Sequence, residues 1–239
     1  MSGTLYLVPT PIGNLSDISD RCRDTLRSVD FIAAEDTRVT LRLLNHLQIK
    51  KPLVSYYEHN KEISGPKIVE RLCSGESCAL VTDAGSPAIS DPGEDLVRLC
   101  AQAGVPVTAI PGPCAAVTAL SVSALPTGRF TFEGFLSTAK KSRFAHLDSL
   151  RAEKRTMIFY EAPHKLAGTL ADLAQVFGGQ RVTAHHGSHK AVIHEFLSSF
   201  CFRAEARKIC PHQKKCQENQ FFTQYQIHIG GLFPAFCSK

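Results

Sequence analysis

Several common nucleotide-binding and hydrolase motifs are missing from this sequence of 239 residues. No G-x-G-x-x-G follows the first predicted strand and no G-x-x-x-x-G-K-[ST] is present, so the sequence does not support an ordinary dinucleotide-binding or P-loop protein. It also has no G-x-S-x-G nucleophile elbow and no helical H-E-x-x-H. Cys210, His212 and Cys216 have a spacing that fits no usual zinc pattern, and we expect no metal site.

Long apolar runs are absent as well. No stretch of eighteen apolar residues occurs, so we expect no transmembrane helix and no membrane partner. The N-terminus lacks a basic region followed by a long apolar one, which argues against a secretory signal and for a cytoplasmic protein. The nine cysteines are odd in number and scattered. They are more typical of free thiols in the cytoplasm than of a disulfide framework.

The composition is that of an ordinary globular protein, with 44% hydrophobic and 21% charged residues. Its length allows one or two domains. The net charge is +5, and residues 184–239 contribute most of it, with seven Lys/Arg against three Glu. The rest of the chain is near neutral, so charge gives only weak support for a nucleic-acid partner.

Short apolar runs alternate with segments of helical periodicity along the first half of the chain. The predicted strands are 4–8, 30–34, 53–56, 79–82 and 105–110, and the predicted helices are 17–28, 39–47, 67–73, 94–103 and 114–122. Five strand–helix units with short connections predict an α/β domain built on a mostly parallel sheet covered by helices.

A second domain follows a linker at 126–128, so we place the two domains at residues 1–124 and 125–239. In the second we expect a mixed α/β arrangement. Its predicted strands are 130–135 and 156–160, with a further one starting at 181, and its predicted helices are 144–153 and 165–176. Residues 184–239 show no consistent period, and we assign them no secondary structure.

Five loops rich in polar residues, Gly and Pro follow the predicted strands: TPIGN, AEDTR, YEHN, DAGSPAISDPG and IPGP. The carboxyl ends of parallel strands meet at one edge of a sheet, where ligands bind, so all five loops fall at that edge. We expect DAGSPAISDPG and the two loops that flank it in the sequence to line one pocket. Each also has a purely structural interpretation. Asp36 can cap the helix that follows it, and Glu35 and Arg38 can form a surface ion pair.

Six motifs follow one another along the chain in the order TPIGNLSDI, AEDTR, YEHN, DAGSPAISDPG, IPGPCA and FYEAPH. Together they resemble the tetrapyrrole methylase fold family, and within that family they resemble the bacterial small-subunit ribosomal RNA methyltransferases. The resemblance covers about residues 4–183. It implies a two-domain α/β fold with S-adenosylmethionine as cofactor. It also implies 2′-O-methylation of a cytidine ribose in small-subunit (16S) ribosomal RNA, an assembled subunit as substrate, and a homodimer.

The same resemblance implies the cofactor-binding residues. They are Pro11 and Gly13 in a first loop; Asp83, Ala84, Gly85 and Pro87 in a second; Pro111, Gly112 and Ala115 in a third; and Phe135 and Leu136 of the second domain, which would cover the adenosine. At Gly85 the lack of a side chain lets a ligand approach the backbone closely.

The chemistry implied is displacement at a sulfonium methyl by a ribose oxygen. The protein must hold that oxygen in line and can help to remove its proton. The candidate catalytic residues are Glu35, Asp36, Arg38 and His59, with Glu161 as a further candidate. Arg38 stays protonated and suits a phosphate or Glu35 as partner. Glu35 and Asp36 rank first because AEDTR is specific to the subfamily, but the residues do not identify the base.

The sequence departs from the family after Val182. An acidic, Leu-containing segment is expected there, but Thr183–Lys190 reads TAHHGSHK. We hypothesise that residues from about 184 onward come from a reading-frame change or an altered gene end, which would leave the C-terminal domain incomplete; the alternative is an authentic divergent tail. Two other functions stay open: a tetrapyrrole (precorrin-type) methylase, and a non-catalytic RNA- or cofactor-binding remnant.

Overall fold

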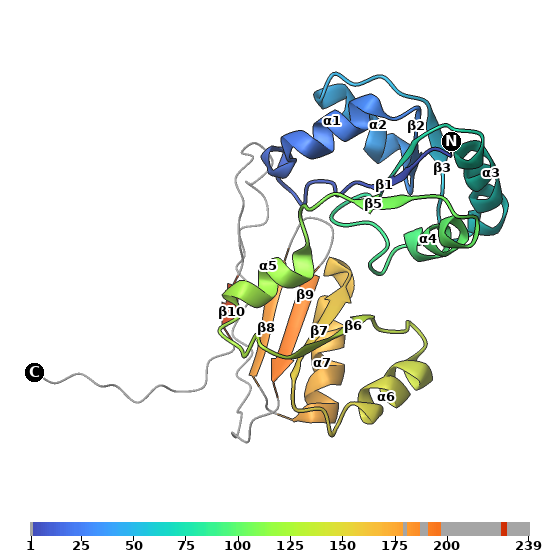
Figure 1. Cartoon of the computed structure of the whole chain (residues 1–239). Coiled ribbons are helices and arrows are strands. Elements are labelled where there is room, and N and C mark those ends of the chain that lie inside the picture. The colour runs from blue at the N-terminus through green and yellow to red at the C-terminus, as the bar shows by residue number, and fades with distance from the viewer. Residues whose placement is uncertain (1, 179–180, 187–190, 197–225, 229–239) are drawn as a thin grey trace, which may run out of the picture. The chain divides into compact units, whose positions relative to one another are not determined.

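The computed structural model describes residues 2–178, 181–186, 191–196 and 226–228 (Figure 1). The chain divides into two compact units, Met1–Ala115 and Ala116–Lys239. The domain boundary between residues 124 and 125 stays a prediction. Each unit is described by itself below.

The first unit is built on a five-stranded sheet in the order β3-β2-β4-β1-β5, and all of its neighbouring strands are parallel. The strands are β1 (Leu5–Leu7), β2 (Phe31–Ala34), β3 (Leu53–Ser55), β4 (Cys78–Val81) and β5 (Val107–Ala109). The helices are η1 (Leu15–Asp17), α1 (Asp20–Ser28), α2 (Thr37–His46), α3 (Lys61–Cys73) and α4 (Gly93–Gln102). The predicted parallel α/β architecture is therefore confirmed.

Helices cover both faces of this sheet (Figure 1). In β2, Ile32 and Ala34 pack with the apolar residues of α1 and α2, whereas Phe31 and Ala33 pack with those of α3 and α4. Successive side chains of a strand point to opposite faces, so a strand covered on both sides must be apolar throughout. This is why β2 and β4 read as unbroken apolar runs in the sequence.

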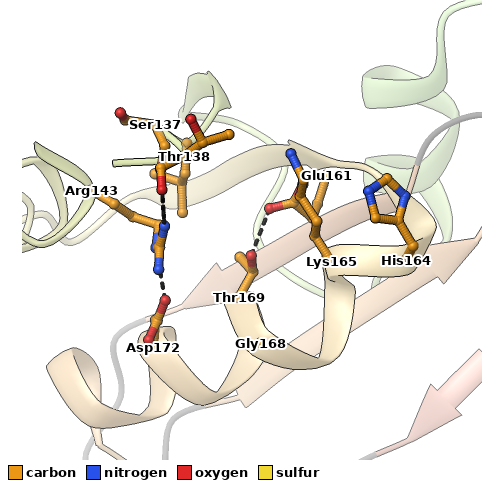
Figure 2. A pocket seen from close by; sticks show the side chains of 10 residues that line it. Ser137, Thr138, Arg143, Glu161, His164, Lys165, Gly168, Thr169 and Asp172 are labelled. Atoms are coloured by element: carbon orange, nitrogen blue, oxygen red, sulfur yellow. Dashed lines mark hydrogen bonds and ion pairs between the residues drawn. The ribbon is translucent and has the colours of Figure 1, made fainter. Parts of the chain in front are cut away.

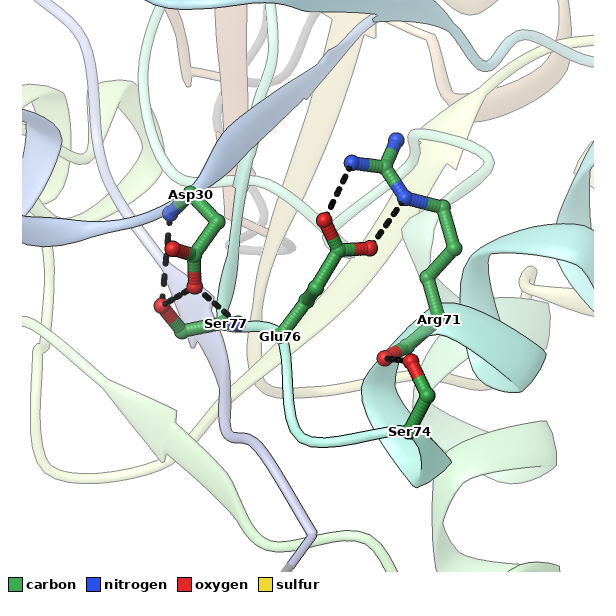
Figure 3. Close-up of polar contacts among 5 residues, drawn as sticks. All are labelled: Asp30, Arg71, Ser74, Glu76 and Ser77. Carbon is green, nitrogen blue, oxygen red and sulfur yellow. Dashed lines mark hydrogen bonds and ion pairs between the residues drawn. The ribbon is translucent and has the colours of Figure 1, made fainter.

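Polar side chains form hydrogen bonds and an ion pair at the amino-terminal edge of the sheet (Figure 3). The Asp30 carboxylate accepts hydrogen bonds from both the backbone N–H and the hydroxyl of Ser77, each at 2.7 Å. Arg71 forms a two-pronged ion pair with Glu76, and its guanidinium lies 3.5 Å above the ring centre of Phe31. These contacts hold the start of β2 beside the start of β4.

The second unit has a five-stranded sheet in the order β10-β8-β9-β7-β6. Only its β6–β7 pair is parallel; β7–β9, β8–β9 and β10–β8 are antiparallel. The strands are β6 (Phe130–Phe135), β7 (Thr156–Glu161), β8 (Arg181–His186), β9 (Ala191–Phe196) and β10 (Gln226–His228). The helices are α5 (Ala115–Val122), α6 (Lys140–Ser149), η2 (Pro163–Lys165) and α7 (Leu166–Phe177).

Three expectations for the elements were wrong. Helix α3 begins at Lys61 rather than at residue 67, because it runs through Pro66, a residue that usually ends helices. Helix α6 covers Lys140–Ser149 rather than 144–153, since its first turn is basic and exposed. Strands β9 and β10 lie where no element was expected, because they depend on pairing with strands distant in the chain.

The Asp30–Ser77 contact predicts a pH-dependent stability. The two hydrogen bonds from Ser77, the backbone one first, lower the pKa of Asp30. A carboxyl whose folded pKa lies below its unfolded value stabilises the fold above the unfolded pKa, and that stabilisation is lost as the pH falls through the folded pKa. We expect Asp30→Asn to lower the Tm at about pH 6, and the gap from wild type to narrow as the pH falls below about 4, the ordinary pKa of an Asp side chain.

Thermal unfolding of both proteins across this range is the measurement. Asp24→Asn on α1 is the control, because the Asp24 side chain is 74% exposed and its contact with Arg27 is 3.6 Å long. A gap for Asp30→Asn that stays constant with pH would contradict the assignment.

Candidate functional site

The loops after β1 and β4 are joined to each other at the carboxyl edge of the first sheet. The Thr10 N–H donates to the Gly85 carbonyl at 2.9 Å, and the Gly85 N–H donates to the Thr10 carbonyl at 3.0 Å. The buried Thr10 hydroxyl donates to the Thr82 carbonyl at 2.9 Å. TPIGN and DAGSP therefore form one hydrogen-bonded unit.

The loop after β5 joins them. The Ser86 hydroxyl donates to the Pro113 carbonyl at 2.9 Å. Gly112 lies so close to the first loop that a Cβ on it would be 2.7 Å from the Cβ of Pro9. The three loops that sequence reasoning assigned to the cofactor thus meet at one place, as expected from their positions in the sheet.

The structure is compatible with a ligand that contacts the backbone of these loops. Gly85 has a φ of +93°, and an added Cβ would lie 3.4 Å from Cδ1 of Ile12. Side chains are rarely tolerated at such a φ, so the loop needs glycine there. Of the other residues assigned to the three loops, Pro11, Ala84 and Pro87 are buried, Asp83 and Ala115 are half-buried, and Gly13, Pro111 and Gly112 are exposed.

The loop after β2 is tied to the loop after β4 by two acidic side chains. The buried Thr82 hydroxyl donates to Oε2 of Glu35 at 2.9 Å. The Asp36 N–H donates to Oδ1 of Asp83 at 3.2 Å. Glu35 is half-buried and adjoins the converging loops. Glu35 therefore lies beside the candidate cofactor loops.

Asp36 has a different environment from Glu35. Its Oδ1 accepts the Arg38 N–H at 2.8 Å and so caps α2, while both carboxylate oxygens accept from the Arg38 guanidinium, at 3.0 and 2.6 Å. Hydrogen bonds from Arg38 hold the pKa of Asp36 well below its usual range and raise that of Arg38. A carboxylate stabilised in this way is a weak base, so the structural interpretation of Asp36 gains support.

His59 is exposed, and its ring lies edge-on to that of Tyr57 at 6.2 Å between centres. The turn that carries it is held by Asn60, whose side chain accepts from the Tyr57 N–H at 2.8 Å and donates to the Ser55 carbonyl at 3.0 Å. This fixes the turn but does not connect His59 to the other loops.

Sequence reasoning missed Tyr56. Its ring is fully buried, and among the described residues its hydroxyl has no hydrogen-bond partner. It lines a very small cavity that Glu35 and Thr82 also line. Burial raises the pKa of Tyr56 to about 12. As the last apolar position of a predicted strand it gave no signal of its own.

The remaining predicted residues belong to the second unit. Phe135 is exposed and contacts the ring of Tyr160 edge-to-face at 5.6 Å. Leu136 is buried and lines a cavity together with Glu161 (Figure 2). The Glu161 carboxylate accepts from the Thr169 hydroxyl at 2.6 Å and from the Ala162 N–H at 2.7 Å. That Phe135 and Leu136 cover an adenosine stays a prediction.

Within the described residues, no group of three or more His, Cys, Asp or Glu side chains is arranged to hold a metal ion. Cys210, His212 and Cys216 lie outside those residues. In the same described part of the chain, none of the helices combines the length and the apolar character needed to cross a membrane.

A family model, Tetrapyrrole (Corrin/Porphyrin) Methylases, matches residues 4–189. The chain belongs to the tetrapyrrole methylase family. The match ends shortly after the change in composition at residue 184. The two-domain fold expected from the resemblance agrees with solved structures of this kind. Uroporphyrin-III-C-methyltransferase from Thermus thermophilus aligns with a TM-score of 0.56 and 19% identity over 81% of this chain and 85% of the other. Diphthine synthase aligns with a TM-score of 0.58 and 14% identity over 81% and 90%.

Curated relatives of this chain are named Ribosomal RNA small subunit methyltransferase I. Those from Xylella fastidiosa, Bacillus subtilis and Escherichia coli O157:H7 are 53%, 52% and 49% identical to it. Each alignment covers 75% of this chain. The chain spans 66%, 62% and 63% of the length of these relatives.

The cap at Asp36 can be tested apart from any activity. We expect Asp36→Ala to lower the Tm by roughly 2–4 °C, because α2 loses its N-cap acceptor. Asp36→Asn keeps a capping oxygen and should lower the Tm much less. Equal losses in the two variants would show that the ion pair with Arg38, rather than the cap, carries the stabilisation.

Proposed function

We propose that this chain is an S-adenosylmethionine-dependent methyltransferase that methylates the 2′ oxygen of a cytidine ribose in small-subunit ribosomal RNA. One structural observation carries the proposal: the three candidate cofactor loops are hydrogen-bonded to one another, and Glu35 is tied to the same assembly through Thr82. The names of the relatives, about half identical in sequence, supply the substrate class.

The residues of the loops suit this cofactor. Ala84 and Gly85 have no bulky side chains, so a ligand can approach the loop closely, and the two hydrogen bonds between Gly85 and Thr10 fix its conformation. S-adenosylmethionine, when bound, supplies a methyl group that its sulfonium charge has already activated. The chain then has to bind and orient the two reactants, and to receive one proton.

Glu35 is the proposed general base. As the ribose oxygen forms its bond to the methyl carbon, the bond from that carbon to sulfur breaks, and the hydroxyl proton has to leave. One carboxylate oxygen of Glu35 accepts a hydrogen bond from Thr82, whereas both oxygens of Asp36 accept hydrogen bonds from Arg38. A base must be within hydrogen-bond reach of the proton and have an available lone pair, and this favours Glu35 over Asp36. His59 remains the second candidate.

Arg38 is proposed to hold an RNA phosphate. Its ion pair with Asp36 engages Nε and Nη2, and its side chain is 86% exposed, so its outer edge can present Nη1 to solvent. A guanidinium bound to a phosphate fixes the register of the strand without reading its sequence. An assembled small subunit as substrate, a homodimer and a cytoplasmic location complete the proposal.

A transfer assay tests the function directly. The protein is incubated with methyl-labelled S-adenosylmethionine and either undermethylated small subunits or a precorrin. Label in the RNA, at a ribose, is the expected result. Label in the pigment would instead show a tetrapyrrole methylase, and cofactor binding without transfer would show a binding remnant. Resequencing the coding DNA beyond residue 184 tests the frame-change hypothesis independently.

Substitution of Gly85 tests the cofactor loops. We expect Gly85→Val to abolish S-adenosylmethionine binding in calorimetric titration, because the side chain opposes a φ of +93° and fills the space beside Ile12. The strain costs roughly 1–3 kcal/mol. Gly104→Val is the matched control, since Gly104 also has a positive φ, +69°, but lies at the other edge of the sheet with nothing within 4 Å of an added Cβ. If both variants fold and bind S-adenosylmethionine with the same affinity as wild type, this loop is not part of the cofactor site.

Single-turnover rates test the base. We expect Glu35→Gln to slow methyl transfer by roughly a hundredfold or more while S-adenosylmethionine affinity stays the same. Asp36→Asn should change the rate only a few-fold. Arg38→Ala should weaken RNA binding roughly tenfold with the cofactor affinity intact. Preserved single-turnover rates in all three variants would overturn the catalytic assignment.

A further inference from the structure

A cavity of about 370 Å³ lies within the second unit, and Leu136, the residue predicted to cover the adenosine, is one of those that line it (Figure 2). Its walls come from the segment after β6, the end of β7, helix α6, and the start of α7. Because β6 and β7 are parallel, this is the carboxyl edge of the parallel pair, the edge at which α/β sheets bind ligands. Its volume falls within the range of small-ligand sites and can hold one nucleotide.

The two carboxylates in this cavity are engaged by the protein itself. Asp172 accepts from Nε of Arg143 at 2.7 Å, while Nη1 of Arg143 donates to the carbonyls of Ser137 and Thr138. The carboxylate of Glu161 is held by Thr169 and by the Ala162 N–H. Arg143 balances the charge of Asp172, whereas the hydrogen bonds to Glu161 come from neutral groups and fix the orientation of its carboxylate.

The basic side chains at the mouth are Lys165, which carries a formal positive charge, and His164, which can donate a hydrogen bond. Both are exposed, and among the residues that the structure describes neither forms an ion pair. They lie in η2, directly before α7, whose N-terminal dipole adds partial positive charge, and Lys165, at the N-cap position, gives that helix no side-chain cap. Hydroxyls of Ser137 and Thr138 complete the polar lining. The mouth is thus suited to an anion, and the interior to a neutral polar group.

We propose that this cavity binds one nucleotide of an RNA strand, with its phosphate at His164 and Lys165 and its sugar or base inside. The inference rests on the proposed function, since it assigns a second contact to the same RNA. Phosphate contacts of this kind position a strand without reading its sequence. A contact on the second unit would help to orient an RNA whose reacting ribose is held by the first.

Gly168 allows the cavity to be filled without disturbing its walls. It lies in the first turns of α7, lines the cavity, and has nothing within 4 Å of an added Cβ. Gly168→Leu should therefore place its side chain in the open space. Helix propensity favours Leu over Gly, so the variant should fold at least as well as wild type. Gly168→Ala adds only one methyl group and shows the effect of the backbone alone.

Binding is measured on the full chain without S-adenosylmethionine, by anisotropy of a labelled cytidine-containing oligoribonucleotide over a series of salt concentrations. Cytidine monophosphate and S-adenosylmethionine are titrated separately. We expect Lys165→Gln to weaken oligonucleotide binding about tenfold and to reduce the salt slope by about 0.7, the value for one lost phosphate contact on a single strand. Gly168→Leu should weaken it by at least as much, whereas Gly168→Ala should have a small effect. Lys141→Gln removes an exposed charge from α6 outside the cavity and should change nothing.

The outcomes separate the inference from the proposed function. Wild-type binding and salt slope in both Lys165→Gln and Gly168→Leu would overturn the inference, as would a wild-type chain that binds no oligonucleotide. Loss of S-adenosylmethionine affinity alone in Gly168→Leu would assign the cavity to the cofactor and overturn it too. Binding of cytidine monophosphate that depends on Lys165 would show that a free nucleotide suffices. Failure of methyl transfer with intact, Lys165-dependent RNA binding would refute the function and leave the cavity assignment standing.

Discussion

The paired hydrogen bonds between Thr10 and Gly85 are the contact on which the candidate site depends. Strands β1 and β4 are parallel neighbours, so the chain leaves both at the same edge. Beyond the strand ends an antiparallel bridge joins the two loops, and Gly85 takes there a φ that other residues avoid. The contacts of Thr82 with Glu35 and of Ser86 with Pro113 start from that fixed loop. A change at Gly85 would therefore displace all of these groups together.

Polar side chains at the two edges of the first sheet have different kinds of partner. At the amino-terminal edge, Asp30 is bonded to Ser77 and Arg71 to Glu76, so these charges are paired within the protein and serve stability. At the carboxyl-terminal edge Asp36 and Arg38 are paired as well, but the half-buried Glu35 accepts a hydrogen bond from the neutral hydroxyl of Thr82. Parallel sheets favour this division, because all strand-to-helix loops leave on one side.

Much of the first unit could be predicted from sequence because its strands are buried on both faces and read as short apolar runs. The meeting of the loops followed from strand direction alone. The start of α3 could not be predicted, since Pro66 normally marks a helix end, yet burial of Ile68 and Leu72 holds the helix on the sheet. Strands β9 and β10 were missed for another reason: β9 pairs with β7 as well as with its neighbour β8, and β10 pairs with β8, so each has a partner strand far away in the chain that local periodicity cannot report.

Within the candidate site, the sequence could not distinguish Glu35 from Asp36. The two acids are adjacent and either could have been the base. The structure separates them by their partners. Asp36 faces the first turn of α2, where the Arg38 backbone and guanidinium both bind it and lower its pKa. Glu35 reaches across to Thr82, on the strand-end that begins the Gly85 loop. The Asp36 carboxylate caps α2 and pairs with Arg38, and it thereby stabilises the loop. The stabilised loop keeps Glu35 facing the candidate cofactor loops.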